Sequence, residues 1–299
     1  MKLFTRIYLS VLLFASLFLS GCIAEDLSDC PTGLKIYFTY DPATYARTGI
    51  EPSEVKWIDV YAFDSRGIFR GVWIEKDPIL SPDYYLSINN LPTGDYRFIA
   101  WGGSDKSGIP SPGAFVPGTT TFNEAILALE HSSGVIDSKI TKLFHAETTA
   151  QVYGNDQRID MPLKQVYNTL NLTTGGLLNS TDTYSMTVYD NNGNYYFDSS
   201  FAPDSDFKYT MLCNKDTGGQ LSASLDVLKL AADRNPVIEI TNDTQGTTLF
   251  KENLAGLINA GGFDYDNLHV FDIHLEFGLS VSVSVNGWTV IDEGNLILN

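Results

Sequence analysis

The chain has 299 residues and is acidic, with 36 Asp and Glu residues against 19 Lys and Arg residues and a net charge of −17. A surface of this sign repels phosphate groups, so the composition argues against nucleic acid and bare anionic lipid as partners. Hydrophobic residues make up 43% of the chain, which is enough for two domains of ordinary size to bury a core each.

The first 21 residues have the features of a secretory signal peptide. Lys2 and Arg6 form a positive start, and the apolar run over residues 7–19 is too short for a comfortable membrane span. Removing residues 1–21 takes away these two bases and no acid, which leaves 17 bases, 36 acids and a net charge of −19. We therefore expect an exported and strongly acidic mature protein.

A cysteine follows the leader directly, and the residues at this site resemble the lipobox of bacterial lipoproteins. The four residues are Leu19, Ser20, Gly21 and Cys22. The resemblance implies that the leader is cut before Cys22 and that this cysteine carries diacylglycerol and an N-acyl chain. Several acyl chains anchor a protein stably, whereas one chain is marginal. Residues 22–31 would then form a lipidated polar tether.

Two further cysteines remain for redox chemistry. Cys30 and Cys213 could form one disulfide in an oxidising compartment, and both could equally be buried and reduced. A bond would close a long loop and tie the start of one domain to the other. Both possibilities stay open.

Alternating apolar and polar residues predict strands in the first half of the mature chain. The apolar face of the candidate first strand consists of Leu34, Ile36, Phe38 and Tyr40. Two pairs of segments flank glycine-containing turns and predict β-hairpins: 57–64 with 68–75, and 84–90 with 95–101.

The rest of this half is less regular. Residues 102–118 hold five glycines and three prolines and predict a long surface loop. Residues 123–131 predict a short helix, and residues 141–147 predict a strand. The polar stretch 154–157 interrupts the pattern, so we place an N-terminal domain over residues 32–158 and a C-terminal domain over residues 159–299.

The second half repeats this alternation of strands and turns. Its predicted strands cover residues 165–174, 184–190, 195–200, 235–243, 270–278 and 280–291. Asn191-Asn192-Gly193 predicts a hairpin, and residues 252–262 predict one short helix that stops at Gly261-Gly262. Strands do not alternate with long helices, so the pattern indicates an all-β fold of two tandem antiparallel β-sandwich domains with one or two short helices.

No catalytic constellation is visible in the sequence, and the common nucleophile, metalloprotease and phosphate-loop motifs are absent. Asp272, His274 and Glu276 share one strand face and could bind a metal, but we favour a polar outer face. Residues 190–194 resemble the start of a calcium loop, yet Phe201 stands where a glutamate ligand is needed, so we interpret them as a turn. We expect no enzyme activity, no cofactor and no metal.

Cys22, the acidic tether and the three segments given next together resemble the fimbrial anchor family of Bacteroidetes, the FimB-type fimbrillin-associated lipoproteins of type V pili. The three segments are LSDCPTGLKIYFTYD at 27–41, YRFIAWGG at 96–103 and SVSVNGWTVIDEG at 282–294. The resemblance implies transthyretin-like Greek-key sandwiches and a lipidated protein at the base of a fimbria in the outer membrane. Glu25 and Asp26 are similar to the surface-export signal of lipoproteins in that phylum.

The resemblance also implies a mode of assembly by strand exchange. Stalk subunits are cut after an arginine that follows the first strand, and a neighbour's C-terminal strand fills the groove that opens. Cutting after Arg47 would separate the body of this chain from Cys22, so we interpret Arg47 as a loop cation. The segment after Trp288 is either a donor strand or the last strand of its own domain, and both remain open.

The sequence therefore favours an outer-membrane, surface-exposed fimbrial subunit that anchors a fimbria and supports cell adhesion. Its partners would be other fimbrial subunits, through strand exchange, and the membrane, through the lipid. The alternative is a surface glycan-binding lipoprotein for nutrient uptake, which an exposed coplanar aromatic patch would favour. A secreted hydrolase would need a converging acid pair in a cleft.

Overall fold

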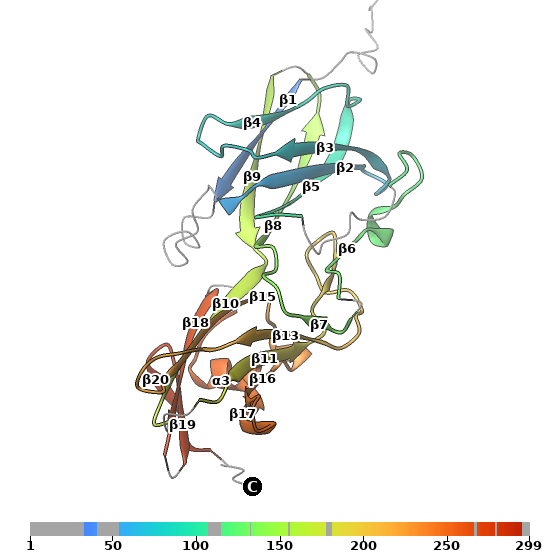
Figure 1. Cartoon of the computed structure of the whole chain (residues 1–299). Coiled ribbons are helices and arrows are strands. Elements are labelled where there is room, and N and C mark those ends of the chain that lie inside the picture. The colour runs from blue at the N-terminus through green and yellow to red at the C-terminus, as the bar shows by residue number, and fades with distance from the viewer. Residues whose placement is uncertain are drawn as a thin grey trace, which may run out of the picture.

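The computed structural model describes residues 33–40, 54–106, 115–131, 133–154, 156–177, 181–265, 268–278 and 280–294. In chain order the strands are β1 (Leu34–Tyr40), β2 (Trp57–Asp64), β3 (Phe69–Lys76), β4 (Tyr85–Ile88), β5 (Gly94–Gly103), β6 (Ile126–Ala128), β7 (Val135–Ile136), β8 (Leu143–Val152), β9 (Gln157–Gln165), β10 (Tyr167–Gly175), β11 (Tyr184–Asp190), β12 (Asn194–Tyr196), β13 (Phe207–Leu212), β14 (Asn214–Lys215), β15 (Leu221–Leu228), β16 (Val237–Asn242), β17 (Thr247–Asn253), β18 (Val270–Phe277), β19 (Val281–Val285) and β20 (Trp288–Gly294). The expected all-β fold is confirmed (Figure 1).

The first half is built on one seven-stranded sheet in the order β3-β2-β5-β8-β9-β1-β4. Buried side chains of β1 and β4 share one apolar core with those of β2 and β5, so the two ends of the sheet form the layers of a sandwich. Alternate residues of β2 and β5 face a different core, which they share with the second half of the chain. Because β2 is buried on both faces, it is almost continuously apolar.

The second half has a six-stranded sheet in the order β14-β15-β10-β18-β19-β20 and a five-stranded sheet in the order β17-β16-β11-β13-β7. Their apolar faces meet in one core. The helix α3 (Leu254–Ala260) confirms the helix expected at 252–262. Asn253 caps it, because its side chain accepts a 2.6 Å hydrogen bond from the Gly256 N–H group.

Strand pairing differs from the expectation in three parallel pairs. β1 pairs with β9, β10 with β18, and β7 with β13 in parallel, so the sheets are mixed and not purely antiparallel. Parallel neighbours need long connections, and the chain supplies them by inserting whole strands between the partners. Alternation within a strand cannot reveal the direction of its neighbours.

Of the three expected hairpins, only the β2–β3 hairpin forms. Its turn has a positive φ of 74° at Gly67. β4 pairs with β1 and not with β5, and its Leu86 and Ile88 complete the first core. β12 does not pair with β11, because β13 and β16 occupy the two edges of β11.

The segment 123–131 forms a strand and not the expected helix. Only a 3-10 turn, η3 (Phe122–Glu124), precedes β6. Leu127 and Leu129 are buried two residues apart, which is the period of a strand, and β6 pairs with β12. Competition from this tertiary pairing overrides the local helical spacing.

The expected domain boundary at residues 158/159 falls inside β9. This strand pairs with β1 and β8, so its residues up to Gln165 belong to the first sheet. The chain changes sheet at Val166, before β10. The polar stretch that suggested a boundary is the connection between β8 and β9.

Candidate functional site

The candidate first strand is an interior strand of the first sheet. β1 pairs over its whole length with β9, and its first four residues also pair with β4. Leu34, Ile36 and Phe38 are buried in the first core, as their alternation predicts. Both edges of β1 are therefore engaged within the chain, and removing it would open the sheet between β9 and β4.

Several predicted site residues lie outside the described part of the chain. They are Leu19, Ser20, Gly21, Cys22, Cys30 and Arg47. The side chain of Tyr40 is likewise not described. Cys213 is half-buried, and burial raises the pKa of its reduced thiol to about 12, so that thiol would be protonated at neutral pH. Its pairing with Cys30 stays a prediction.

The C-terminal strand β20 lies at the edge of the six-stranded sheet, and among the described strands it pairs with β19 alone. The two strands form a hairpin through Asn286 and Gly287, both with positive φ, as a tight two-residue turn requires. Val290 and Ile291 are half-buried against the second core, whereas Trp288 is 68% exposed. Up to Gly294 the segment is thus a strand of its own domain, with one edge unpaired by any described strand.

The two halves are joined by a segment from the first half, residues 115–140, which we name the strap. It leaves the first sheet after β5, and its residues 126–128 and 135–136 form β6 and β7 in the second half (Figure 1). β6 pairs with β12, and β7 completes the five-stranded sheet beside β13. The strap therefore supplies strands that the second half does not contain itself.

An aromatic contact fills the joint beneath the strap. Phe197 of the second half is completely buried, with ring centroids 4.9 Å from Tyr61 and 5.3 Å from Phe115. His145 of β8 donates from Nε2 to the Phe197 carbonyl oxygen at 2.9 Å, and its ring lies 4.7 Å from Trp101. Burial lowers the pKa of His145 to about 4, so the joint holds a neutral imidazole at physiological pH.

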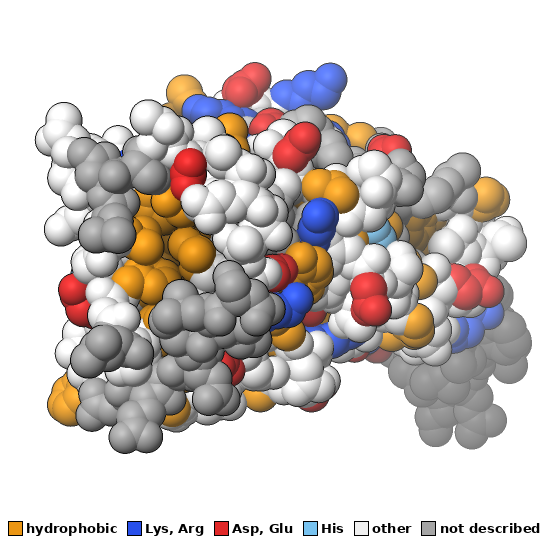
Figure 2. All heavy atoms as spheres, turned by 60° about the horizontal axis from the view of Figure 1, so that its bottom comes forward, with side chains coloured by type: hydrophobic (Ala, Val, Ile, Leu, Met, Phe, Trp, Pro, Cys, Tyr) orange, Lys and Arg blue, Asp and Glu red, His pale blue; other side chains and the backbone are white. Residues whose placement is uncertain are grey.

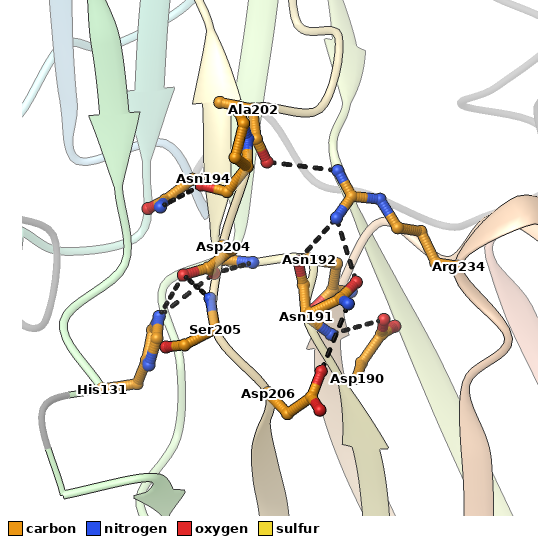
Figure 3. A network of polar contacts seen from close by, with 12 residues as sticks. His131, Asp190, Asn191, Asn192, Asn194, Ala202, Asp204, Ser205, Asp206 and Arg234 are labelled. Atoms are coloured by element: carbon orange, nitrogen blue, oxygen red, sulfur yellow. Dashed lines mark hydrogen bonds and ion pairs between the residues drawn. The ribbon is translucent and has the colours of Figure 1, made fainter.

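A polar network surrounds the turn after β11 (Figure 3). Arg234 donates hydrogen bonds to the Asn191 carbonyl oxygen at 2.8 Å and to Asn191 Oδ1 at 2.9 Å. On the strap, His131 Nε2 lies 3.0 Å from Asp204 Oδ1. A Cβ at position 193 would lie 2.6 Å from Asp204 Oδ2, which accepts a 2.9 Å hydrogen bond from the Gly193 N–H group, so a larger residue there would displace the Asp204 side chain. The segment 190–194 connects β11 to β12, and its polar groups are hydrogen-bonded to Arg234 and Asp204.

Asp190 differs from the other residues of this network because one of its carboxylate oxygens has no hydrogen-bond partner. Its side chain is buried, and Oδ1 accepts a 2.7 Å hydrogen bond from the Asn191 N–H group. Oδ2 is buried without a hydrogen-bond partner. Burial, reinforced by Asp206 and Asp204, raises the pKa of Asp190 to about 7 although Arg234 opposes the shift. Sequence reasoning missed this site, because nothing in the local pattern shows that the carboxylate is buried.

The residues considered for metal binding form a polar strand face. His274 lies 2.9 Å from Thr173 Oγ1 through Nδ1 and 3.3 Å from Glu276 Oε2 through Nε2, in an exposed position. Asp272 accepts instead from Asn171 Nδ2 at 2.9 Å. Throughout the described ranges, no group of three or more His, Cys, Asp or Glu residues could hold a metal ion.

The surface shows no concentrated charge on the face drawn in Figure 2, where acidic and basic side chains lie scattered among neutral ones. The exposed ring of Tyr85 is tilted by 41° from that of Tyr37, so the two do not form a coplanar aromatic platform. No helix in the described ranges is both long and apolar enough to cross a membrane.

Comparison with known proteins gives a family match over residues 27–294, to the fimbrillin-A associated anchor proteins Mfa1 and Mfa2. Among curated proteins, the minor fimbrium anchoring subunit Mfa2 of Porphyromonas gingivalis is 26% identical over 291 residues, covering 90% of this chain and 88% of that protein.

Solved structures show the same fold. The fimbrial anchor protein Mfa2 from Porphyromonas gingivalis superposes with a TM-score of 0.73 at 23% identity, covering 87% of this chain and 99% of that one. A candidate polysaccharide binding protein from Bacteroides thetaiotaomicron also gives a TM-score of 0.73, at 20% identity and with 88% and 99% coverage. A candidate adhesin from Bacteroides ovatus gives 0.70 at 20% identity, with 89% and 96% coverage.

Proposed function

The chain belongs to the family of fimbrillin-A associated anchor proteins Mfa1 and Mfa2, and from this premise we propose that it anchors a fimbria at the cell surface. Its lipid would be carried by Cys22 in the outer membrane, and its fimbria would support cell adhesion. The related protein that is 26% identical carries the name of an anchoring subunit. The family match supports the role, and the arrangement of the terminal strands supports the mechanism.

The observation that carries the proposal is the position of β1. This strand is the first described element after the expected lipid attachment site, and it is hydrogen-bonded to β9 and β4. A pull on a lipid at Cys22 would reach the fold first at β1, and the strand could leave only by breaking its bonds to both neighbours. Three buried apolar side chains on one face add to that resistance. An anchor requires such an N-terminal strand.

The opposite end of the chain offers a place for another subunit. β20 is an edge strand, and an edge strand presents N–H and C=O groups to which a further strand can add. In our proposal, the neighbouring fimbrial subunit pairs with this edge or accepts the C-terminal segment as a donor strand. The membrane and the filament would then be held by opposite ends of the chain.

The lipid attachment is tested by replacing Cys22 with alanine. We expect Cys22→Ala to abolish metabolic labelling with a fatty acid and to release the protein from the membrane fraction, because no acyl chain remains. Cys213→Ala is the matched control, and this variant should be labelled like the wild type. Labelled Cys22→Ala protein would contradict the lipid attachment without bearing on the filament contact.

The filament contact is tested separately by deleting residues 290–299. We expect a folded, lipidated protein that no longer co-purifies with fimbriae, since the deletion removes most of β20 and all that follows. A second deletion of residues 295–299 leaves β20 intact and separates an edge contact from a donor segment. Retention of filaments by the folded 290–299 deletion would refute the role of this end.

A further inference from the structure

Two of the three parallel strand pairs follow each other along the chain. β1 pairs with β9 over seven residue pairs in the first half, and β10 pairs with β18 over seven residue pairs in the second half. Only Val166 separates β9 from β10. In Figure 1 these two strands run in succession from the upper half of the molecule into the lower half. The chain thus joins one parallel pair directly to the other.

The parallel direction decides how the first pair responds to a pull. Leu34, the first residue of β1, lies opposite Gln157, the first residue of β9, whereas the chain leaves for the second half from the other end of β9. A force that pulls these two points apart slides the strands past each other. The hydrogen bonds of a parallel pair are evenly spaced along it, so they share such a force. In a hairpin the two free ends lie side by side, and pulling them apart breaks the bonds one after another.

The six-stranded sheet of the second half is loaded in the same way. β18 and β20 are both antiparallel to β19, so they run in the same direction. Gly294 at the end of β20 lies opposite Val281, and Val281 lies opposite Phe277 at the end of β18. The end of β20 and the first residue of β10, Tyr167, are therefore at opposite ends of the sheet. A pull between them acts along the strands.

Side chains strengthen the pair in the second half. Asn171 Nδ2 donates a hydrogen bond to Asp272 Oδ1 at 2.9 Å, and Thr173 Oγ1 lies 2.9 Å from His274 Nδ1. In both cases the two residues are direct partners in the register of β10 and β18. On the opposite face this pair packs into the second core, as the first pair packs into the first core. Sliding either pair therefore disrupts side-chain contacts as well as backbone bonds.

We propose that β1, β9, β10 and β18 form an axis that carries tension through the protein. Tension enters at the first residue of β1, passes to β9 through their hydrogen bonds and crosses into the second half along the covalent chain at Val166. It then passes from β10 to β18 and leaves through β19 and β20. Because the chain itself crosses between the halves, the joint is not pulled apart. That the axis meets tension in the cell rests on the proposed anchoring function, whereas the axis is a property of the fold.

The test is to pull single molecules of the mature chain in two directions and to measure the force at which they first unfold. One handle is at the N-terminus, and the other is either at the C-terminus or at position 153, through Tyr153→Cys. Tyr153 is 68% exposed, and its N–H group donates to Gln157 Oε1 at 3.3 Å, so a handle there pulls at the first residue of β9 and peels β1 away. Both directions use this same variant, with the three native cysteines replaced by alanine so that no disulfide bypasses β1.

We expect the mean unfolding force between the two termini to be at least about twofold higher than that between the N-terminus and position 153, because shared bonds resist better than bonds broken in turn. The free energy of unfolding is the same in both directions, so stability cannot cause the difference. An equal or lower force between the termini would show that the proposal is wrong.

A matched pair of variants tests whether β1 bears the force. Ile36 of β1 and Ile58 of β2 are both fully buried in the first core, but β2 lies outside the axis. Ile36→Ala and Ile58→Ala should both lower the urea midpoint, and Ile36→Ala should lower the force between the termini more. Equal losses of force would also overturn the proposal. If Ile36→Ala does not fold, the two pulling directions alone decide. Neither measurement involves the lipid or a filament, so failure here would leave the anchoring function standing.

Discussion

β1 and β20 are both terminal strands of seven residues, yet β1 lies inside a sheet and β20 lies at the edge of one. β1 lies inside its sheet, with neighbours on both edges and fully buried Leu34 and Ile36 on one face. β20 lies at the edge of its sheet, and its Val290 and Ile291 are only half-buried. The end that we assign to the membrane is thus locked into the fold, and the end that we assign to the filament is left accessible.

This difference follows from how many neighbours each strand has. A strand with two neighbours loses two rows of hydrogen bonds when it leaves, and it exposes a core face as well. An edge strand loses one row, so the rest of the sheet can survive without it. The chain therefore shows at its two ends the two properties that an anchor needs.

The largest expected effect comes from placing a carboxylate in each strand. Ile36→Asp puts an unpaired charge where exposure is 0%, and we expect the free energy of unfolding to fall by about 4 kcal/mol. Val290→Asp at the half-buried edge should cost only about 1–2 kcal/mol, because the new side chain can turn toward water. Urea unfolding midpoints measure both, and equal losses would contradict the comparison.

A smaller effect is expected from acid, through His145 in the joint between the two halves. The folded pKa of His145 is about 4, below the unfolded value of 6.5, so the unfolded state binds more protons between these values. Neutral His145 therefore contributes up to about 3 kcal/mol to the free energy of unfolding above pH 6.5. This contribution is lost as the pH falls toward 4.

The variant His145→Gln separates this contribution from general acid unfolding. A glutamine amide can still donate to the Phe197 carbonyl oxygen but does not titrate. We expect its unfolding midpoint to fall less between pH 7 and pH 5 than that of the wild type. Equal decreases in the two proteins would contradict the lowered pKa of His145.

The smallest expected effect concerns Trp288 at the start of β20. Its side chain is 68% exposed, so Trp288→Ala should change the free energy of unfolding by no more than about 0.5 kcal/mol. Trp101→Ala is the contrasting variant, since that ring is buried in the joint, and about 3–5 kcal/mol should be lost. A large loss for Trp288→Ala would mean that β20 is held as firmly as an interior strand.

Sequence reasoning found the strands whose side chains alternate cleanly. β1, β2, β11 and β18 begin and end within a residue of their expected bounds. β15, which has no counterpart among the expected strands, alternates in the same way, with Leu221, Leu225 and Val227 buried. The helix α3 could be found because its apolar spacing, its Asn253 cap and its glycine stop agree. Each of these signals is local, since it arises within a few consecutive residues.

Pairing and the buried site could not be found in this way. β4 pairs with β1 and β12 pairs with β6 because those pairings bury apolar faces across long stretches of chain. Asp190 resembles any turn acid in the sequence, and it becomes buried only because β13, the 3-10 turn η4 (Ala232–Arg234) and the strap close around it. Its raised pKa and its unpaired oxygen are therefore properties of the tertiary structure.

The acidic composition, the all-β pattern and the order of segments of a fimbrial anchor could be read from the sequence alone, because composition, period and motif order depend only on neighbouring residues. The tertiary structure decided which edges are closed, which terminal strand is accessible and how the strap joins the two halves. These features depend on which apolar faces pack together across long separations in the chain. The local pattern of a strand is the same whichever strand it pairs with.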